Sequence, residues 1–394
     1  MRKYLLTTIA TLFSVTVFAQ LSGNGYYRIQ HVSSGRYITI VNDKVDKDNR
    51  DKSKITSTSY ANVYALKTIK PASDVVCDPG SIIYIEQNGS ENKYILRAQG
   101  MDTKELTNGR YLSIYDYSKR NGVGYLLYAS SDGIAAYLKD YGEQTDETGN
   151  TGHARLNTKE NDEARWYIKP INETEEYVAI KPEFSINGKY YATYYASYPF
   201  SLSTGMKAYY VRSINANGSE NDMAELVEIT GSIPSATPII IECSSANPTD
   251  NKITLLTTSG TPIKDNLLNG VYFSYVMMNA LGTAESTTAM AQELKNVVNY
   301  DSKTMRVIGE VDGKIGLVKA SNMKYLPANK AYIKVPSVSA ANIKLLDSES
   351  YATNIMPLNT DRHSSAIYTL SGTKVSGKTQ KGIYLIDGKK VIVK

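Results

Sequence analysis

Apolar and polar residues alternate along much of this chain in short runs separated by small or turn-forming residues. In residues 25–40, two such runs flank Ser33, Ser34 and Gly35, and the apolar residues of both runs fall on the same side. A period of two residues is typical of strands with one buried face, and small residues between them suit a tight turn. This stretch therefore predicts a β-hairpin.

Altered copies of this hairpin follow. One turns at residues 88–90 and the next at 130–133, while 109–114 nearly repeats 35–40. Similar units spaced by roughly forty to fifty residues are typical of folds built from repeats around an axis. The first part of the chain is therefore expected to be a closed, three-fold β structure.

These motifs resemble the β-trefoil family, with its ricin-like and fascin-like members. The family carries a Tyr-x-Ile strand, a Ser-Gly-Arg-Tyr-Ile turn and strand, and a closing Trp-x-Ile strand. The resemblance covers residues 22–170 and implies a β-trefoil there. Ricin-like lectins also carry Gln-x-Trp beside each sugar site, whereas the single tryptophan here, Trp166, follows Ala164 and Arg165. The resemblance thus leaves the ligand open.

Strand-like runs separated by Asn-Gly, Pro and Ser continue through residues 175–336 and predict a second all-β domain. Only 283–300 departs from this pattern, because its apolar residues have helical spacing, and it predicts a short inserted helix or a loop. The phrases at 233–240 and 326–332 are similar to an accessory β-sandwich-like module of secreted proteins from Gram-negative gut and oral anaerobes. That resemblance implies a non-catalytic appendage.

Tyrosine dominates the aromatic residues, with 32 against 5 phenylalanines. In one run of the second domain, Tyr190, Tyr194 and Tyr198 are expected on one strand face, and Tyr191 and Tyr195 on the other. One face must belong to the core. The other is a candidate ligand-binding platform for a sugar ring, since tyrosine offers both an apolar face and a hydroxyl group. Cross-strand packing is the alternative.

The two ends of the chain have targeting patterns. Residues 1–19 combine basic residues, an apolar run and a small-residue end, which predicts a secretory signal peptide cleaved between Ala19 and Gln20. No other stretch approaches the roughly 20 apolar residues of a membrane span, so no transmembrane span is expected. The protein is therefore predicted to be exported, either extracellular or displayed on the cell surface of a Gram-negative bacterium.

Residues 337–362 are mostly small and polar and predict a linker. Residues 363–394 resemble the C-terminal sorting domain of type IX secretion, which implies the outer-membrane secretion machinery as a partner. The alternative for this segment is a basic β flap on the preceding domain.

The distribution of charge argues against one class of partner, and the cysteine content limits the possible disulfides to one. The formal charge of +5 arises from the C-terminal end, where six lysines accompany one aspartate in residues 374–394, so nucleic acid is not an expected partner. Cys77 and Cys243 remain after export. We expect two buried thiols, with a disulfide as the alternative.

No arrangement of residues reaches the pattern of a catalytic or metal site, so no cofactor is expected. The carboxylates of 43–51 lack the glycine and closing glutamate of a calcium loop. His31, His153 and His363 have no Cys or His partner at metal-ligand spacing. The carboxylates of 143–147 and 160–163 read as ordinary loop charges. The sequence therefore predicts a non-catalytic, carbohydrate-binding or protein-binding exported protein. The alternatives are a scaffold component of a surface assembly or a carboxylate-dependent glycoside hydrolase.

Overall fold

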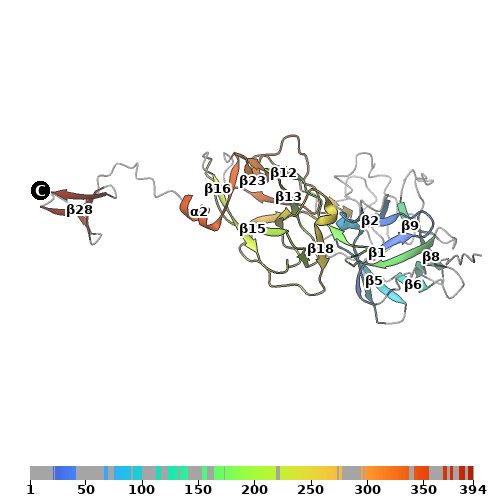
Figure 1. Cartoon of the computed structure of the whole chain (residues 1–394). Helices are drawn as coiled ribbons and strands as arrows, with labels where there is room; N and C mark the ends of the chain where they lie inside the picture. Colours follow the sequence, from blue (N-terminus) through green and yellow to red (C-terminus); the bar gives the residue numbers. More distant parts are fainter. Residues whose placement is uncertain are drawn as a thin grey trace, which may run out of the picture. The chain divides into compact units, whose positions relative to one another are not determined.

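The computed structural model divides the chain into two compact units, residues 1–345 and 346–394. It describes residues 21, 23–40, 66–69, 75–89, 92–99, 112–116, 123–131, 134–140, 153–157, 164–172, 174–218, 222–272, 275–276, 294–295, 298–336, 341–354, 367–370, 373–375, 381–386 and 389–393. Strands dominate these residues, so the predicted all-β class is confirmed (Figure 1).

The first sheet of unit 1 has ten strands, six of which close into a ring. Around the ring, β1 pairs with β4, β4 with β5, β5 with β6, β6 with β7, and β7 with β10. The ring closes because β10 also pairs with β1. The other four strands, β2, β3, β9 and β8, form a second path from β1 to β7. The strands are β1 (Gly25–His31), β2 (Tyr37–Ile40), β3 (Leu66–Ile69), β4 (Ile83–Gln87), β5 (Lys93–Ala98), β6 (Leu112–Asp116), β7 (Tyr125–Ser131), β8 (Ile134–Asp140), β9 (His153–Asn157) and β10 (Arg165–Pro170). Whether this ring is a β-trefoil stays a prediction.

The alternation in β1 explains how the ring is filled. Tyr27 and Ile29 are buried, and they lie opposite Ile83 of β4 and Ile168 of β10, which are buried as well. Period-two burial of this kind is expected for strands that line one core. Arg28 points to the other side of β1, yet it is also fully buried. The outer face of the ring is therefore covered at this point.

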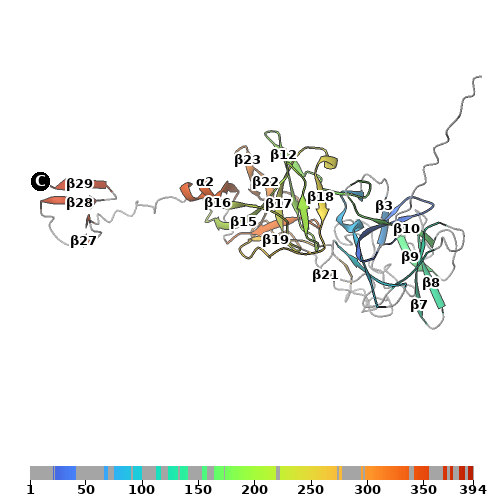
Figure 2. The ribbon, with the colours of Figure 1, turned by 60° about the horizontal axis from the view of Figure 1, so that its bottom comes forward.

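The second sheet of unit 1 also has ten strands, in the order β12-β13-β17-β15-β16-β25-β23-β22-β24-β19, and a three-stranded sheet β11-β18-β14 accompanies it (Figure 2). Its strands are β12 (Phe184–Ile186), β13 (Lys189–Tyr194), β15 (Lys207–Asn215), β16 (Met223–Ile229), β17 (Ile239–Cys243), β19 (Leu268–Gly270), β22 (Met305–Val311), β23 (Lys314–Val318), β24 (Ala331–Lys334) and β25 (Ile343–Asp347). The smaller sheet comprises β11 (Val178–Ala179), β14 (Phe200–Leu202) and β18 (Lys252–Leu255), and the 3₁₀ turn η5 (Pro248–Asp250) precedes β18.

The two sheets of unit 1 share a core. Ile82, which precedes β4, packs in the same buried cluster as Ile241 of β17 and Tyr198, which follows β13. The Tyr26 hydroxyl donates to the carbonyl of Leu256 at 3.0 Å, and its ring meets that of Tyr198 at 6.0 Å. The predicted domains 22–170 and 175–336 thus belong to one compact unit.

The predicted linker at 337–362 is wrong for residues 343–354, whereas 337–340 and 355–362 lie outside the described residues. Residues 343–347 form β25, which lies between β16 and β23, and Ser348–Asn354 form the helix α2. Ile343 and Leu345 are buried, whereas Lys344 and Leu346 between and after them are half-buried. The adjacent leucines interrupt the period-two pattern of a strand, so the sequence signal is weak.

The helix or loop expected at 283–300 falls largely outside the described residues. Within it, Leu294–Lys295 form the short strand β21, which pairs with β20 (Tyr275–Val276). The predicted signal peptide and its cleavage position at Ala19 and Gln20 lie wholly outside the described residues.

Unit 2 contains α2 and a four-stranded antiparallel sheet in the order β27-β26-β28-β29. Its strands are β26 (Ile367–Thr369), β27 (Lys374–Val375), β28 (Gly382–Ile386) and β29 (Lys389–Val393). The β structure expected for the end of the chain is therefore present.

Candidate functional site

The five tyrosines proposed as a ligand platform are packed into unit 1. Tyr191, Tyr194 and Tyr198 are buried, with exposed fractions of 6%, 5% and 0%, while Tyr190 and Tyr195 are half-buried. None of the five is exposed. Their part in ligand binding stays a prediction, but burial favours the packing alternative.

The position of β13 in the sheet explains this burial. Tyr194 packs in the core that is shared with the first sheet, whereas Tyr191 packs in a second core with Val211 and Ile333. Both faces of β13 are thus covered. Burial and the nearby Glu242 raise the pKa of Tyr191 to about 12, and burial also raises the pKa of Tyr194.

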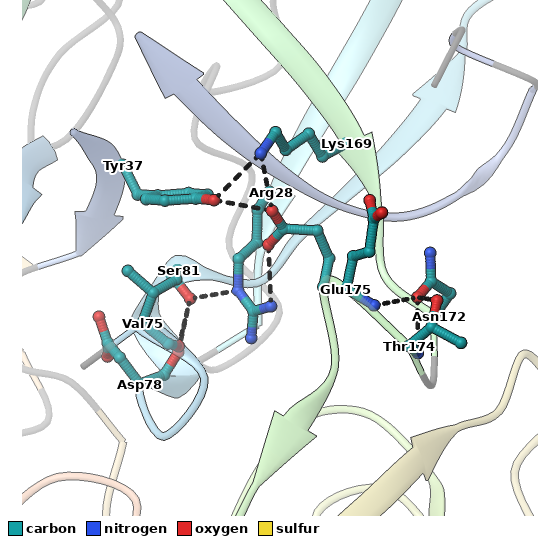
Figure 3. A network of polar contacts seen from close by, with 10 residues as sticks. Arg28, Tyr37, Val75, Asp78, Ser81, Lys169, Asn172, Thr174 and Glu175 are labelled. Carbon is teal, nitrogen blue, oxygen red and sulfur yellow. Dashed lines mark hydrogen bonds and ion pairs between the residues drawn. The ribbon is translucent and has the colours of Figure 1, made fainter. Parts of the chain in front are cut away.

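A buried polar cluster, which sequence reasoning missed, lies where the outer face of the ring is covered (Figure 3). Arg28 Nη1 donates to Glu176 Oε2 at 3.3 Å. The other carboxylate oxygen, Oε1, accepts from the Tyr37 hydroxyl at 2.7 Å and from Lys169 Nζ at 3.1 Å. We call Arg28, Tyr37, Ser81, Lys169 and Glu176 the junction cluster.

Two local turns place members of this cluster. The 3₁₀ turn η2 (Pro79–Ser81) begins at Asp78, whose side chain accepts from Gly80 N at 2.9 Å. Asp78 is thus an N-cap, and proline suits the first position of such a turn. The turn fixes Ser81, whose Oγ accepts from Arg28 Nε at 3.0 Å.

The second turn follows β10 and returns Glu176 to the ring. The side-chain oxygen of Asn172 accepts from the backbone nitrogens of Thr174 at 2.8 Å and Glu175 at 3.0 Å. The backbone nitrogen of Asn172 also donates to the carbonyl of Glu176 at 3.2 Å. Asparagine favours such turns because its side chain satisfies nearby backbone donors.

The electrostatics of the junction cluster indicate a structural role. Glu176 is 8% exposed and its carboxylate accepts from two cations and one phenol, so its lone pairs serve the chain itself. Burial and the hydrogen bond to Glu176 raise the pKa of Tyr37. A carboxylate held in this way would have to break three contacts before it accepted a proton from a substrate. The cluster is therefore suited to holding the junction of the two sheets.

A second cluster contains residue types found in hydrolases. Ser34 Oγ donates to Asp140 Oδ2 at 2.7 Å, and His31 Nδ1 lies 2.9 Å from the same Oγ and 3.5 Å from the same carboxylate oxygen. In a catalytic triad the histidine uses one ring nitrogen for the serine and the other for the aspartate. Here one nitrogen faces both, and Arg36 also pairs with Asp140. This arrangement fits support of the β1–β2 turn rather than nucleophile activation.

The remaining candidate residues add no site within the part of the chain that the structure describes. The carboxylates of 43–51, 143–147 and 160–163, together with His363, lie outside the described residues. Within the part of the chain that the structure describes, no group of three His, Cys, Asp or Glu residues is arranged to hold a metal ion. Cys77 and Cys243 are thiols rather than a disulfide, and burial raises the pKa of Cys243 to about 12.

The fold defines the class as an all-β protein with two ten-stranded sheets in one compact unit. No helix of the described residues is long and apolar enough to cross a membrane. No family model and no curated protein matches the chain.

Among solved structures, the chain is similar to one described as the structure and mode of action of a mosquitocidal holotoxin. The identity is 11% and the TM-score 0.25, and the match covers 79% of this chain and 34% of the other. The chain thus spans about a third of that protein's length. At this TM-score the likeness gives no information about fold or function.

Proposed function

We propose that this protein is an exported, non-catalytic binding protein that recognises a glycan or a protein. The observation that carries the proposal is the junction cluster, whose charged and phenolic groups are engaged with one another between two β-sheets. A buried ion cluster of this kind holds elements in a fixed arrangement. Fixed β scaffolds commonly present ligands with the segments that connect their strands.

The closed ring supports the β-trefoil part of this proposal. Six strands return on themselves, and β2, β3, β9 and β8 join β1 to β7 by a second path of paired strands. Such closure removes free strand edges, which leaves turns and connecting segments for recognition. Two of the polar connections are residues 41–65, between β2 and β3, and 141–152, between β8 and β9.

An array experiment tests this function. The chain from Gln20 is applied to a glycan array and to an array of host proteins, and retention is compared with that of a variant in which 141–152 is replaced by a Gly-Ser segment of equal length. We expect retention on one array and its loss in the variant. A matched control exchanges Lys189 and Glu242, an ion pair of 2.9 Å on the second sheet, and should keep retention.

Other results contradict the proposal. Retention on neither array, together with self-association of the chain, favours the scaffold alternative. Release of shortened glycans from the array identifies a glycoside hydrolase instead.

A further inference from the structure

The C-terminal sheet of unit 2 exposes large apolar side chains. Among the described residues of the whole chain, five large hydrophobic side chains are exposed, and three of them belong to this sheet or its first turn. They are Tyr368, Leu370 and Ile383, with exposed fractions of 38%, 57% and 40%. Exposed apolar side chains gathered in so short a segment mark a contact surface.

The strand register places these side chains together. Tyr368 of β26 lies opposite Leu385 of β28, and Ile383 is two residues before Leu385, so Tyr368 and Ile383 share one face. Leu370 follows Tyr368 by two residues. On the other face, Ile367 and Tyr384 are half-buried. We call the face with Tyr368 and Ile383 the apolar face.

Lysines lie at the two margins of the apolar face. Lys374 of β27 is opposite Tyr368 and is exposed, and Lys390 of β29 is opposite Leu385. These are the two outer strands of the sheet. Lys374, exposed on the edge strand β27, disfavours the addition of a further strand there. The excess of lysines in this segment favours an anionic occupant of the apolar face over a second copy of the chain.

We propose that the apolar face binds an anionic lipid surface. Six lysines against one aspartate in residues 374–394 complement such a surface. Apolar side chains flanked by cations are the combination that holds a protein in the interfacial region of a bilayer. Side chains that protrude, as Tyr368, Leu370 and Ile383 do, suit a lipid surface, which has no need of a recess on the protein.

Vesicle sedimentation tests the proposal. The chain from Gln20 is used so that the apolar N-terminal segment cannot itself bind lipid. It should sediment with vesicles of equal parts phosphatidylglycerol and phosphatidylcholine, less with phosphatidylcholine alone, and less as salt increases. The double variant Tyr368→Ser/Ile383→Ser should lower the partition coefficient about tenfold or more, because each apolar side chain favours insertion. Val123→Ser/Leu267→Ser, at the two other exposed positions, is the matched control and should not lower it.

A charge variant keeps the test decisive if the apolar variant does not fold. Lys374→Gln/Lys381→Gln changes exposed side chains only, and should weaken binding to phosphatidylglycerol vesicles by about thirtyfold, as expected for two lysines at an anionic surface. The proposal is overturned if the parent chain does not sediment with anionic vesicles, or if the control variant loses as much binding as the apolar variant. It is also overturned if polyglutamate binds the chain through the same residues while vesicles do not.

Discussion

Replacing Glu176 with glutamine removes the only carboxylate that Arg28 contacts in the junction cluster. The amide keeps the shape of the side chain, and its oxygen can still accept from Tyr37 or Lys169. Its nitrogen, however, would face Arg28 Nη1, which now donates to Glu176 Oε2 at 3.3 Å. Two donors would then meet, and the guanidinium would stay buried without a counter-charge.

The size of the effect follows from burial. The Arg28 side chain is 0% exposed and that of Glu176 is 10% exposed, so water cannot solvate the orphaned charge. Breaking such a buried pair typically costs about 3–5 kcal/mol. Domains of ordinary stability unfold with about 5–15 kcal/mol. The variant is therefore expected to lose a large fraction of the stability of unit 1.

Urea unfolding measures this loss with two probes. Trp166 is the only tryptophan and is fully buried in the first sheet, so its fluorescence reports the ring, while far-ultraviolet circular dichroism reports all strands. Because both sheets share a core, we expect one transition, shifted equally for both probes. The matched control is Glu86→Gln, which breaks the more exposed pair with Arg97 at 3.0 Å and should cost at most about 1 kcal/mol.

The reasoning is refuted if Glu176→Gln costs no more free energy of unfolding than Glu86→Gln. A shift of the tryptophan transition alone would show that the two sheets unfold separately, against the shared core.

Three further outcomes are expected. Gly270→Ala would place a Cβ 2.2 Å from the ring of Tyr195, so the free energy of urea unfolding should fall by about 1–3 kcal/mol. The control Gly260→Ala, whose Cβ would have its nearest neighbour at 3.4 Å, should change this free energy little, and equal effects of the two variants would contradict the packing. Cys243, whose pKa is raised to about 12, should react with iodoacetamide at pH 8 far more slowly in the folded chain than in urea. Mass spectrometry of the peptide that contains Cys243 measures both rates, and equal rates would contradict its burial. Burial raises the pKa of Tyr26 to about 12, so the folded state holds the phenolic proton more tightly than the unfolded state does. The contribution of Tyr26 to stability should therefore be complete below pH 10 and be lost between pH 10 and 12. Urea midpoints that stay constant over this range would contradict the prediction.

Much of the fold was readable from period-two patterns. In β1 and β10, apolar residues alternate with polar ones, and Ile29 and Ile168 indeed meet inside the ring. The sequence pattern does not predict that residues 22–170 and 175–336 pack into one compact unit. The contact between Tyr26 and Tyr198 joins residues far apart in the chain, and a local pattern carries no information about such a contact. Strand β25 is hard to predict because its three apolar residues, Ile343, Leu345 and Leu346, do not alternate strictly with polar ones.

The junction cluster was hidden for a different reason. Arg28 and Lys169 occupy the polar phase of their strands, where a sequence pattern predicts exposure to solvent. Arg28 is nevertheless fully buried, and Lys169 keeps only 33% of its side chain exposed. Glu176 lies in an acidic connector whose sequence resembles that of a solvated turn. The tyrosines show the converse. The sequence pattern predicts a strand with one exposed face, but Tyr191 and Tyr194 pack on opposite faces of β13, and each face meets a core.

The place of β25 bears on how unit 1 is completed. This strand is the last of its sheet in the sequence, yet it lies in the interior, between β16 and β23. Until residue 347 has emerged during synthesis or export, the sheet can exist only as two halves with open hydrogen-bonding edges. A chain that ends before β25 should therefore fold poorly, so the second sheet of unit 1 can be completed only after β25 has been added.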